Sequence, residues 1–182
     1  MPPAGRPSSP PPSRFSVDST SWWPTPVGHH RARSRPRRSS GTPALDLNLM
    51  SVVGMARAAI PAMQAQRWGR FVAITSVSVR QPIPTIILSN TARAGVTGFL
   101  KTVALEVARD GVTVNTVARA CTPPIVRCSF GDPSAMAAGI PVGSLGDPAD
   151  FGSIVTFLCS EQAKFVTGAQ LHVDGGTFGG LQ

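Results

Sequence analysis

The sequence contains no tyrosine, so no phenolic side chain is available to it as an acid or a base. Cysteine is scarce: the three cysteines are odd in number and form no C-x-x-C pair, which favours reduced thiols in a cytosolic compartment over a disulfide framework. No signal-peptide core and no apolar run of about 18 residues occur, so neither secretion nor membrane spanning is supported. The histidines lack partners at ligand spacing, and we expect no metal site.

Acidic residues are also few, and the resulting net charge of +8 is concentrated at the N-terminus. Residues 1–43 hold seven arginines against Asp18 alone, together with ten of the 18 prolines and nine serines. This segment has no apolar periodicity with which to offset the entropy of ordering. We therefore expect a disordered basic tail over 1–43, followed by one domain over 44–182.

Three other readings of the tail remain open. The run Arg31–Arg38 could neutralise phosphates, but without a fold to position it we expect a solvated segment and no nucleic-acid binding. An Arg-rich and Ser-rich start is also typical of an organelle transit peptide, although the density of proline opposes an amphipathic helix. An out-of-frame reading of a GC-rich gene would likewise produce such a tail, and the upstream nucleotide sequence would test that idea.

From residue 44 onward, helical and strand patterns alternate. Apolar residues recur every three to four positions over 44–67, which predicts an amphipathic helix. A continuous apolar run ending near Thr75 predicts a buried parallel strand. A second long helix over 88–109 should end at a left-handed Gly111, and a strand over 112–118 follows. Asp147-Pro148 is typical of a helix start, and 170–173 forms a last short strand.

A set of motifs occurs in fixed order around these elements. Ser76 ends the first strand, the block Ser89-Asn90-Thr91-Ala92-Arg93 begins thirteen residues later, and Asn48 lies 28 residues before Ser76. Gly143-Ser144-Leu145-Gly146-Asp147-Pro148 and Val173-Asp174-Gly175-Gly176 follow downstream. Together these motifs resemble the short-chain dehydrogenase/reductase family over about residues 44–182. In that family the strand-end serine is followed by Tyr-x-x-x-Lys, so Ser89 stands in the tyrosine position and Arg93 in the lysine position.

The resemblance implies an α/β fold with a doubly wound, Rossmann-like parallel sheet. The sheet is incomplete here, because the three predicted strands lack the first half and its glycine-rich cofactor turn. The resemblance also implies NAD or NADP as cofactor and a ketone and secondary-alcohol pair as substrate, with a 3-oxoacyl compound among the candidates. Cytoplasmic localisation and homo-oligomers formed through the helices 44–67 and 88–109 are further implications.

The resemblance assigns a role to each site position. Ser76 would orient the carbonyl, Asn48 would support a water relay, and Arg93, Ala120 and Pro124 would lie beside the cofactor. In the family a tyrosine phenol acts as general acid, but an aliphatic hydroxyl at Ser89 is a far weaker acid and a shorter side chain. We expect Ser89 to be a helix N-cap instead. Catalysis should then be impaired or absent, and the alternative is a non-catalytic, truncated homologue that keeps the oligomerisation helices and a marginal stability.

Overall fold

The computed structural model describes residues 41–120 and 132–181. Most of the expected tail, together with Cys121, Pro124 and Cys128, lies outside the described residues. The domain boundary near residue 44 therefore stays a prediction. No helix in the described ranges combines the length and the apolar character that crossing a membrane would require.

The first helical run has three parts. These are the helix α1 (Gly41–Leu45), a single π-helical segment η1 (Asp46–Met50) and the helix α2 (Ser51–Ala65). The predicted helix over 44–67 is thus confirmed, with helical structure beginning a few residues earlier. The π-helical segment is not foreseeable from the apolar periodicity, and such segments often accompany functional side chains.

The remaining elements follow the predicted order. They are β1 (Gly69–Ser76), η2 (Val77–Val79), α3 (Ile87–Val107), η3 (Ala108–Asp110), β2 (Val112–Arg119), α4 (Pro133–Ala138), α5 (Pro148–Leu158), η5 (Glu161–Ala163) and β3 (Gln170–Val173). The Asp147 carboxylate caps α5 by accepting a hydrogen bond from the backbone N–H of Ala149, as the Asp-Pro signature predicts.

The three strands form one parallel sheet in the order β1-β2-β3. β2 is the central strand, and seven of its eight residues are buried, as expected for a strand covered on both faces. Its register aligns Ser76, the last residue of β1, with Arg119, the last residue of β2. Within the described residues, the other edge of β1 has no partner strand. The mixed α/β fold with a parallel, Rossmann-like sheet is thereby confirmed.

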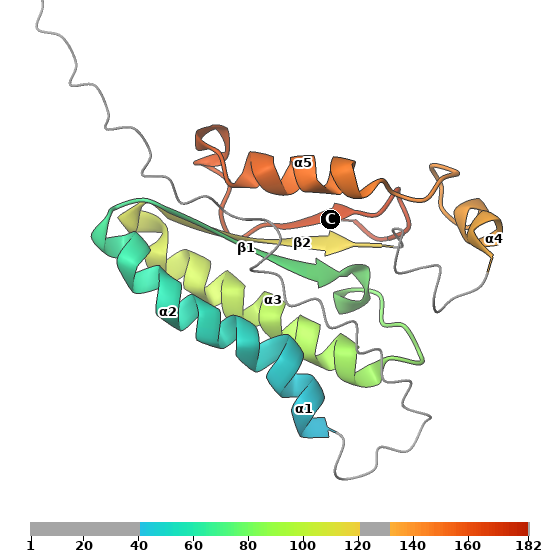
Figure 1. Ribbon diagram of the computed structural model, residues 1–182, viewed down its shortest axis with the longest axis horizontal. Helices are drawn as coiled ribbons and strands as arrows, with labels where there is room; N and C mark the ends of the chain where they lie inside the picture. Colours follow the sequence, from blue (N-terminus) through green and yellow to red (C-terminus); the bar gives the residue numbers. More distant parts are fainter. Residues whose placement is uncertain (1–40, 121–131, 182) are drawn as a thin grey trace, which may run out of the picture.

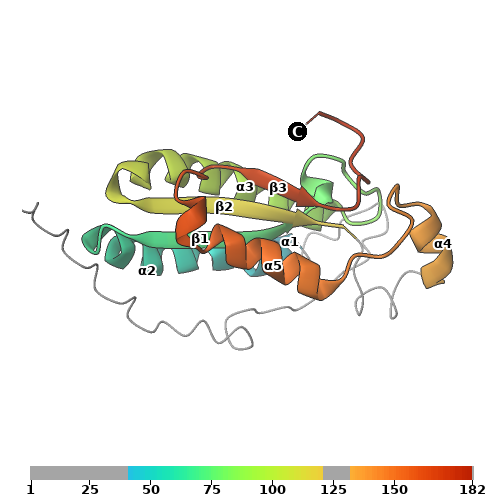
Figure 2. The same cartoon turned by 90° about the horizontal axis from the view of Figure 1, so that it is seen from above.

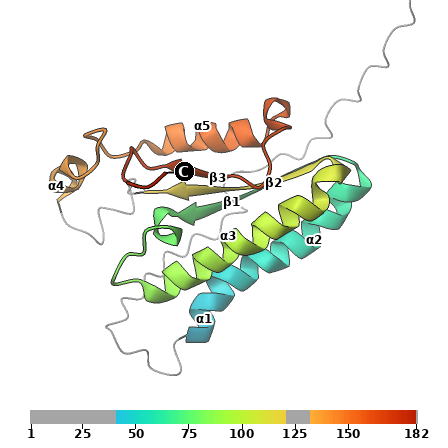
Figure 3. The same ribbon diagram turned by 180° about the vertical axis from the view of Figure 1, so that it is seen from behind.

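Helices cover both faces of this sheet. Figures 1 and 3 show α2 and α3 side by side on one face and α5 on the opposite face, and Figure 2 shows β2 between β1 and β3. Between α2, α3 and the sheet lies a core that includes Ala56, Val96, Leu100 and Val114. Beneath α5, a smaller core joins Val117, Leu158 and Ala163. The sheet is therefore the middle layer of three.

Two tight turns meet at the amino end of the sheet. Gly111 adopts the left-handed conformation (φ +76°) between η3 and β2, as predicted, and Arg67 does so (φ +57°) between α2 and β1. The Gly69 N–H donates to the Gly111 carbonyl over 3.3 Å, and the Arg67 guanidinium pairs with Asp110 at 3.0 Å. These contacts hold the start of β1 against the start of β2.

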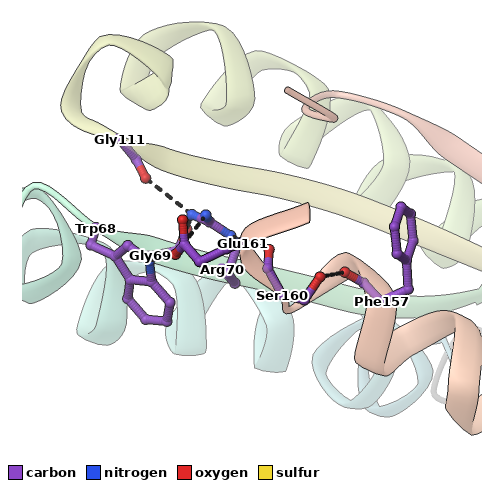
Figure 4. A network of polar contacts seen from close by, with 7 residues as sticks. All are labelled: Trp68, Gly69, Arg70, Gly111, Phe157, Ser160 and Glu161. Carbon is purple, nitrogen blue, oxygen red and sulfur yellow. Dashed lines mark hydrogen bonds and ion pairs between the residues drawn. The ribbon is translucent and has the colours of Figure 1, made fainter. Parts of the chain in front are cut away.

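Arg70 ties this end of the sheet to the end of α5. Figure 4 shows its guanidinium among the carbonyls of Gly69, Gly111 and Ser160, which accept hydrogen bonds over 2.8, 3.3 and 3.2 Å, respectively. Its side chain is only 4% exposed, whereas its carboxylate partner, Glu161, is 66% exposed. Because several acceptors surround this cation, the burial of its charge is compensated.

Candidate functional site

Ser76 lies at the carboxyl end of β1, where the chain turns into η2. Its Oγ accepts a hydrogen bond from the backbone N–H of Ser78 over 3.1 Å and thereby caps η2. A serine hydroxyl that accepts one bond can still donate its own proton. Ser76 therefore keeps a donor at the sheet edge where ligands bind in parallel α/β folds.

Asn48 and Arg93 meet across the two helical segments that carry them. Asn48 lies in the π-helical segment η1, where its Nδ2 donates to the Ala44 carbonyl over 3.0 Å. Its Oδ1 accepts a hydrogen bond from Nη2 of Arg93, on α3, over 3.3 Å. Asn48 is thus both a local polar group satisfied within its own helix and a partner of the residue in the lysine position.

The prediction that Ser89 is a helix N-cap is wrong. α3 begins at Ile87 after Ile86, so Ser89 is its third residue, and the Ile86 carbonyl accepts the Asn90 N–H over 3.0 Å. The helix includes Ile87 and Leu88 before Ser89, and the residue that precedes it, Ile86, makes no side-chain capping hydrogen bond. The Ser89 Oγ instead accepts a hydrogen bond from Nε of Arg93 over 3.2 Å, one helical turn away.

We call Asn48, Ser89 and Arg93 the Arg93 cluster. Arg93 is half-buried, and this burial lowers the pKa of its guanidinium from the ordinary value; the like charge of Arg119 lowers it further. Since arginine stays protonated in proteins, the result is a partly desolvated positive charge beside a second one. In Figure 1, α1 and the start of α3 lie toward the end of the sheet to which the β1 and β2 arrows point.

The predicted site residues are therefore only partly brought together. Hydrogen bonds join the three residues of the Arg93 cluster, whereas Ser76 is connected to them only by its register position beside Arg119. Ala120 follows β2, and its N–H donates to the Val173 carbonyl over 3.4 Å. Pro124 lies outside the described residues. In the same ranges, His, Cys, Asp and Glu side chains do not gather into a group that could hold a metal ion.

Arg119 was not among the predicted site residues. It was visible as a cation at the end of a strand, but its relation to Arg93 depends on how β2 packs against α3. In the structure β1 and β2 both have eight residues, and their parallel register aligns Ser76 with Arg119.

Comparison with known proteins agrees with this architecture. The profile of a family described as enoyl-(acyl carrier protein) reductase matches residues 34–177, most of the chain. The fold and the ordered motifs are those of the Rossmann-like α/β class. The chain belongs to the short-chain dehydrogenase/reductase family.

Individual relatives support the same assignment. The 3-oxoacyl-[acyl-carrier-protein] reductase FabG of Vibrio cholerae is 36% identical over 146 residues, which are 79% of this chain and 60% of that protein. A (2S)-[(R)-hydroxy(phenyl)methyl]succinyl-CoA dehydrogenase subunit, BbsC, of Thauera aromatica is 39% identical over 143 residues, covering 73% of this chain and 53% of the relative. A solved structure titled "Dehalogenation enzyme" superposes with a TM-score of 0.76 at 28% identity, over 82% of this chain and 64% of its own. The chain spans little more than half the length of the curated relatives that it matches.

Proposed function

We propose that this protein is a short-chain oxidoreductase for a ketone and secondary-alcohol pair in which proton transfer to the substrate is strongly weakened. One observation carries the proposal: Ser89, in the position of the family's phenol, is held by Arg93 over 3.2 Å inside α3. The similarity to a 3-oxoacyl-[acyl-carrier-protein] reductase supports a 3-oxoacyl compound as the substrate class.

The remaining groups are suited to orient a carbonyl. The Ser76 hydroxyl accepts from Ser78 and has its proton left to donate to a carbonyl oxygen. The Ser89 hydroxyl likewise has its proton left to donate, because its oxygen accepts a hydrogen bond from Arg93. Both are aliphatic alcohols and therefore poor proton donors compared with a phenol of pKa about 10. Loss of general-acid catalysis typically lowers a rate by about 10²- to 10⁴-fold.

The family implies NAD or NADP, whose reduced form supplies hydride when bound, but the described donor set does not fit this cofactor well. A lysine ammonium is compact, whereas the Arg93 guanidinium is a planar fork whose Nε and Nη2 already donate to Ser89 and Asn48. Arg119 adds a second positive charge, which disfavours the cationic ring of an oxidised nicotinamide. The described ranges also contain no strand followed by a G-x-G-x-x-G turn that would bind a pyrophosphate.

A gain-of-function experiment tests the proposal. The double variant Ser89→Tyr with Arg93→Lys should raise NADPH-dependent reduction of a 3-oxoacyl thioester by about 10²-fold or more over the parent chain. The matched control, Ser89→Phe with Arg93→Lys, adds the same ring without the hydroxyl and should not show this gain. A parent chain that already turns over as fast as the tyrosine variant would contradict the proposal.

The second candidate is a non-catalytic homologue that retains the oligomerisation helices. Two observations favour it: β1 lacks a second partner strand in the described residues, and apolar side chains on η1 and α3 are exposed, notably Met50, Ile87 and Leu105. A chain of this kind would assemble with copies of itself or with longer homologues in a reducing, cytoplasmic compartment. Neither the parent chain nor either double variant would then quench NADPH fluorescence or oxidise NADPH, while sedimentation would report an oligomer.

A further inference from the structure

The Arg93 guanidinium has unused hydrogen-bonding capacity. Of its five N–H donors, one on Nε bonds to Ser89 and one on Nη2 bonds to Asn48. These two occupy one side of the planar fork. The remaining three lie on Nη1 and on the outer position of Nη2, and no residue of the described ranges accepts a hydrogen bond from them. That outer edge has the parallel pair of donors that binds an oxyanion through two oxygens.

The charge balance around Arg93 points to the same kind of ligand. Within 41–120 and 132–181, the ion pairs involve Arg67, Arg70 and His172, and none of them compensates Arg93. Its two hydrogen-bond partners, Asn48 and Ser89, are neutral. Partial burial of this cation and the like charge of Arg119 both disfavour the protonated form. A bound anion would offset both effects.

The location agrees with a ligand site. Asn48 and Ser89 hold the Arg93 fork from one side, so its orientation is fixed before a ligand arrives. The register of β1 and β2 brings Ser76 and Arg119 to the same carboxyl edge of the sheet, where parallel α/β folds bind their ligands.

We propose that the outer edge of Arg93, assisted by the charge of Arg119, binds the oxyanion group of a small molecule. Both a carboxylate and a phosphate have this chemistry, since each presents two oxygens to a guanidinium fork. The site thus takes an anion in the position that the family resemblance places beside the cofactor. Anion binding requires no turnover, so it stands or fails independently of the proposed oxidoreductase function.

Calorimetric titration of the full chain tests this site. The probes are acetoacetate, inorganic phosphate and neutral acetone, each at constant ionic strength set with chloride. Acetoacetate or phosphate should bind saturably, and acetone should not. Saturation by acetoacetate alone would identify an organic acid as the ligand class, and saturation by phosphate alone would identify a phosphate ester. Saturation by neither would overturn the proposal.

Matched variants separate a built site from general charge. Arg93→Met should weaken anion binding by about tenfold or more, because a charge-assisted hydrogen-bonding partner is lost. Arg109→Met removes an equal charge from an exposed position just before β2, at the opposite end of the sheet, and should leave binding unchanged. Equal weakening in both variants would overturn the proposal in favour of non-specific attraction.

A conservative variant guards against a folding defect. Arg93→Lys keeps the charge and removes the planar fork, so it should weaken binding several-fold while far-ultraviolet circular dichroism matches that of the parent. If Arg93→Met does not fold, Arg93→Lys and Arg109→Met decide the question. Parent-like affinity in a folded Arg93→Lys protein would contradict bidentate recognition.

Discussion

Replacing Gly111 with alanine would test the contact between the two turns at the amino end of the sheet. Gly111 has a left-handed backbone (φ +76°), and an added Cβ would lie 2.3 Å from the carbonyl oxygen of Arg67 and 3.0 Å from its carbon. These atoms belong to the backbone of Arg67, which itself has a left-handed conformation. The turn cannot yield as the end of a flexible side chain would.

The cost has two parts. A left-handed alanine costs about 1–2 kcal/mol. Moving the Arg67 carbonyl away would also strain the 3.3 Å hydrogen bond from the Gly69 N–H to the Gly111 carbonyl, and a typical bond of this kind contributes about 0.5–1.5 kcal/mol. We therefore expect Gly111→Ala to lower the free energy of unfolding by about 1.5–3.5 kcal/mol. That loss is a large fraction of the ~5–15 kcal/mol by which small domains are stable.

Gly143 supplies the matched control. Its backbone is also left-handed (φ +80°), but an added Cβ would meet no atom within 4 Å. Gly143→Ala should therefore lose only the backbone part, about 1–2 kcal/mol. Urea unfolding followed by far-ultraviolet circular dichroism measures both variants against the parent. If Gly111→Ala loses no more stability than Gly143→Ala, the reasoning about the Arg67 contact is refuted.

Two further positions probe buried polar contacts. The buried Asn115 amide donates to the Val166 carbonyl over 2.8 Å and accepts from the Ala169 N–H over 3.1 Å. Asn115→Ala should lower the free energy of unfolding by about 2–4 kcal/mol, because both of these groups would lose their partner; parent-like urea unfolding would contradict this. Arg70→Met should cost about 2–4 kcal/mol by leaving its carbonyl acceptors unpaired, whereas Glu161→Gln, at an exposed partner, should cost less than about 1 kcal/mol. If Arg70→Met and Glu161→Gln lower the free energy of unfolding equally, the carbonyl hydrogen bonds of Arg70 are not its main contribution to stability.

The secondary structure could be predicted from the sequence because its determinants are local. Apolar spacing located α2, with Ala56 and Ile60 buried on the predicted stripe. Gly111 and Asp147 mark a left-handed turn and a helix start whose geometry depends on a few neighbouring residues. The expectation for Ser89 failed for the complementary reason. A serine at a plausible start looks like a cap, but the helix continued backward through Ile87, which carries no recognisable signal.

The sequence by itself determined the family, the order of the elements and the identity of the residues at the altered positions. Fixed spacing between Ser76, Ser89 and Arg93 is a property of the chain and needs no coordinates. Only the tertiary structure decided what these residues do to one another. Arg93 bonds to Asn48, 45 residues away, because η1 and α3 pack together. Arg119 reaches the same region because the parallel register sets the end of β2 beside the end of β1, and no local pattern encodes that long-range pairing.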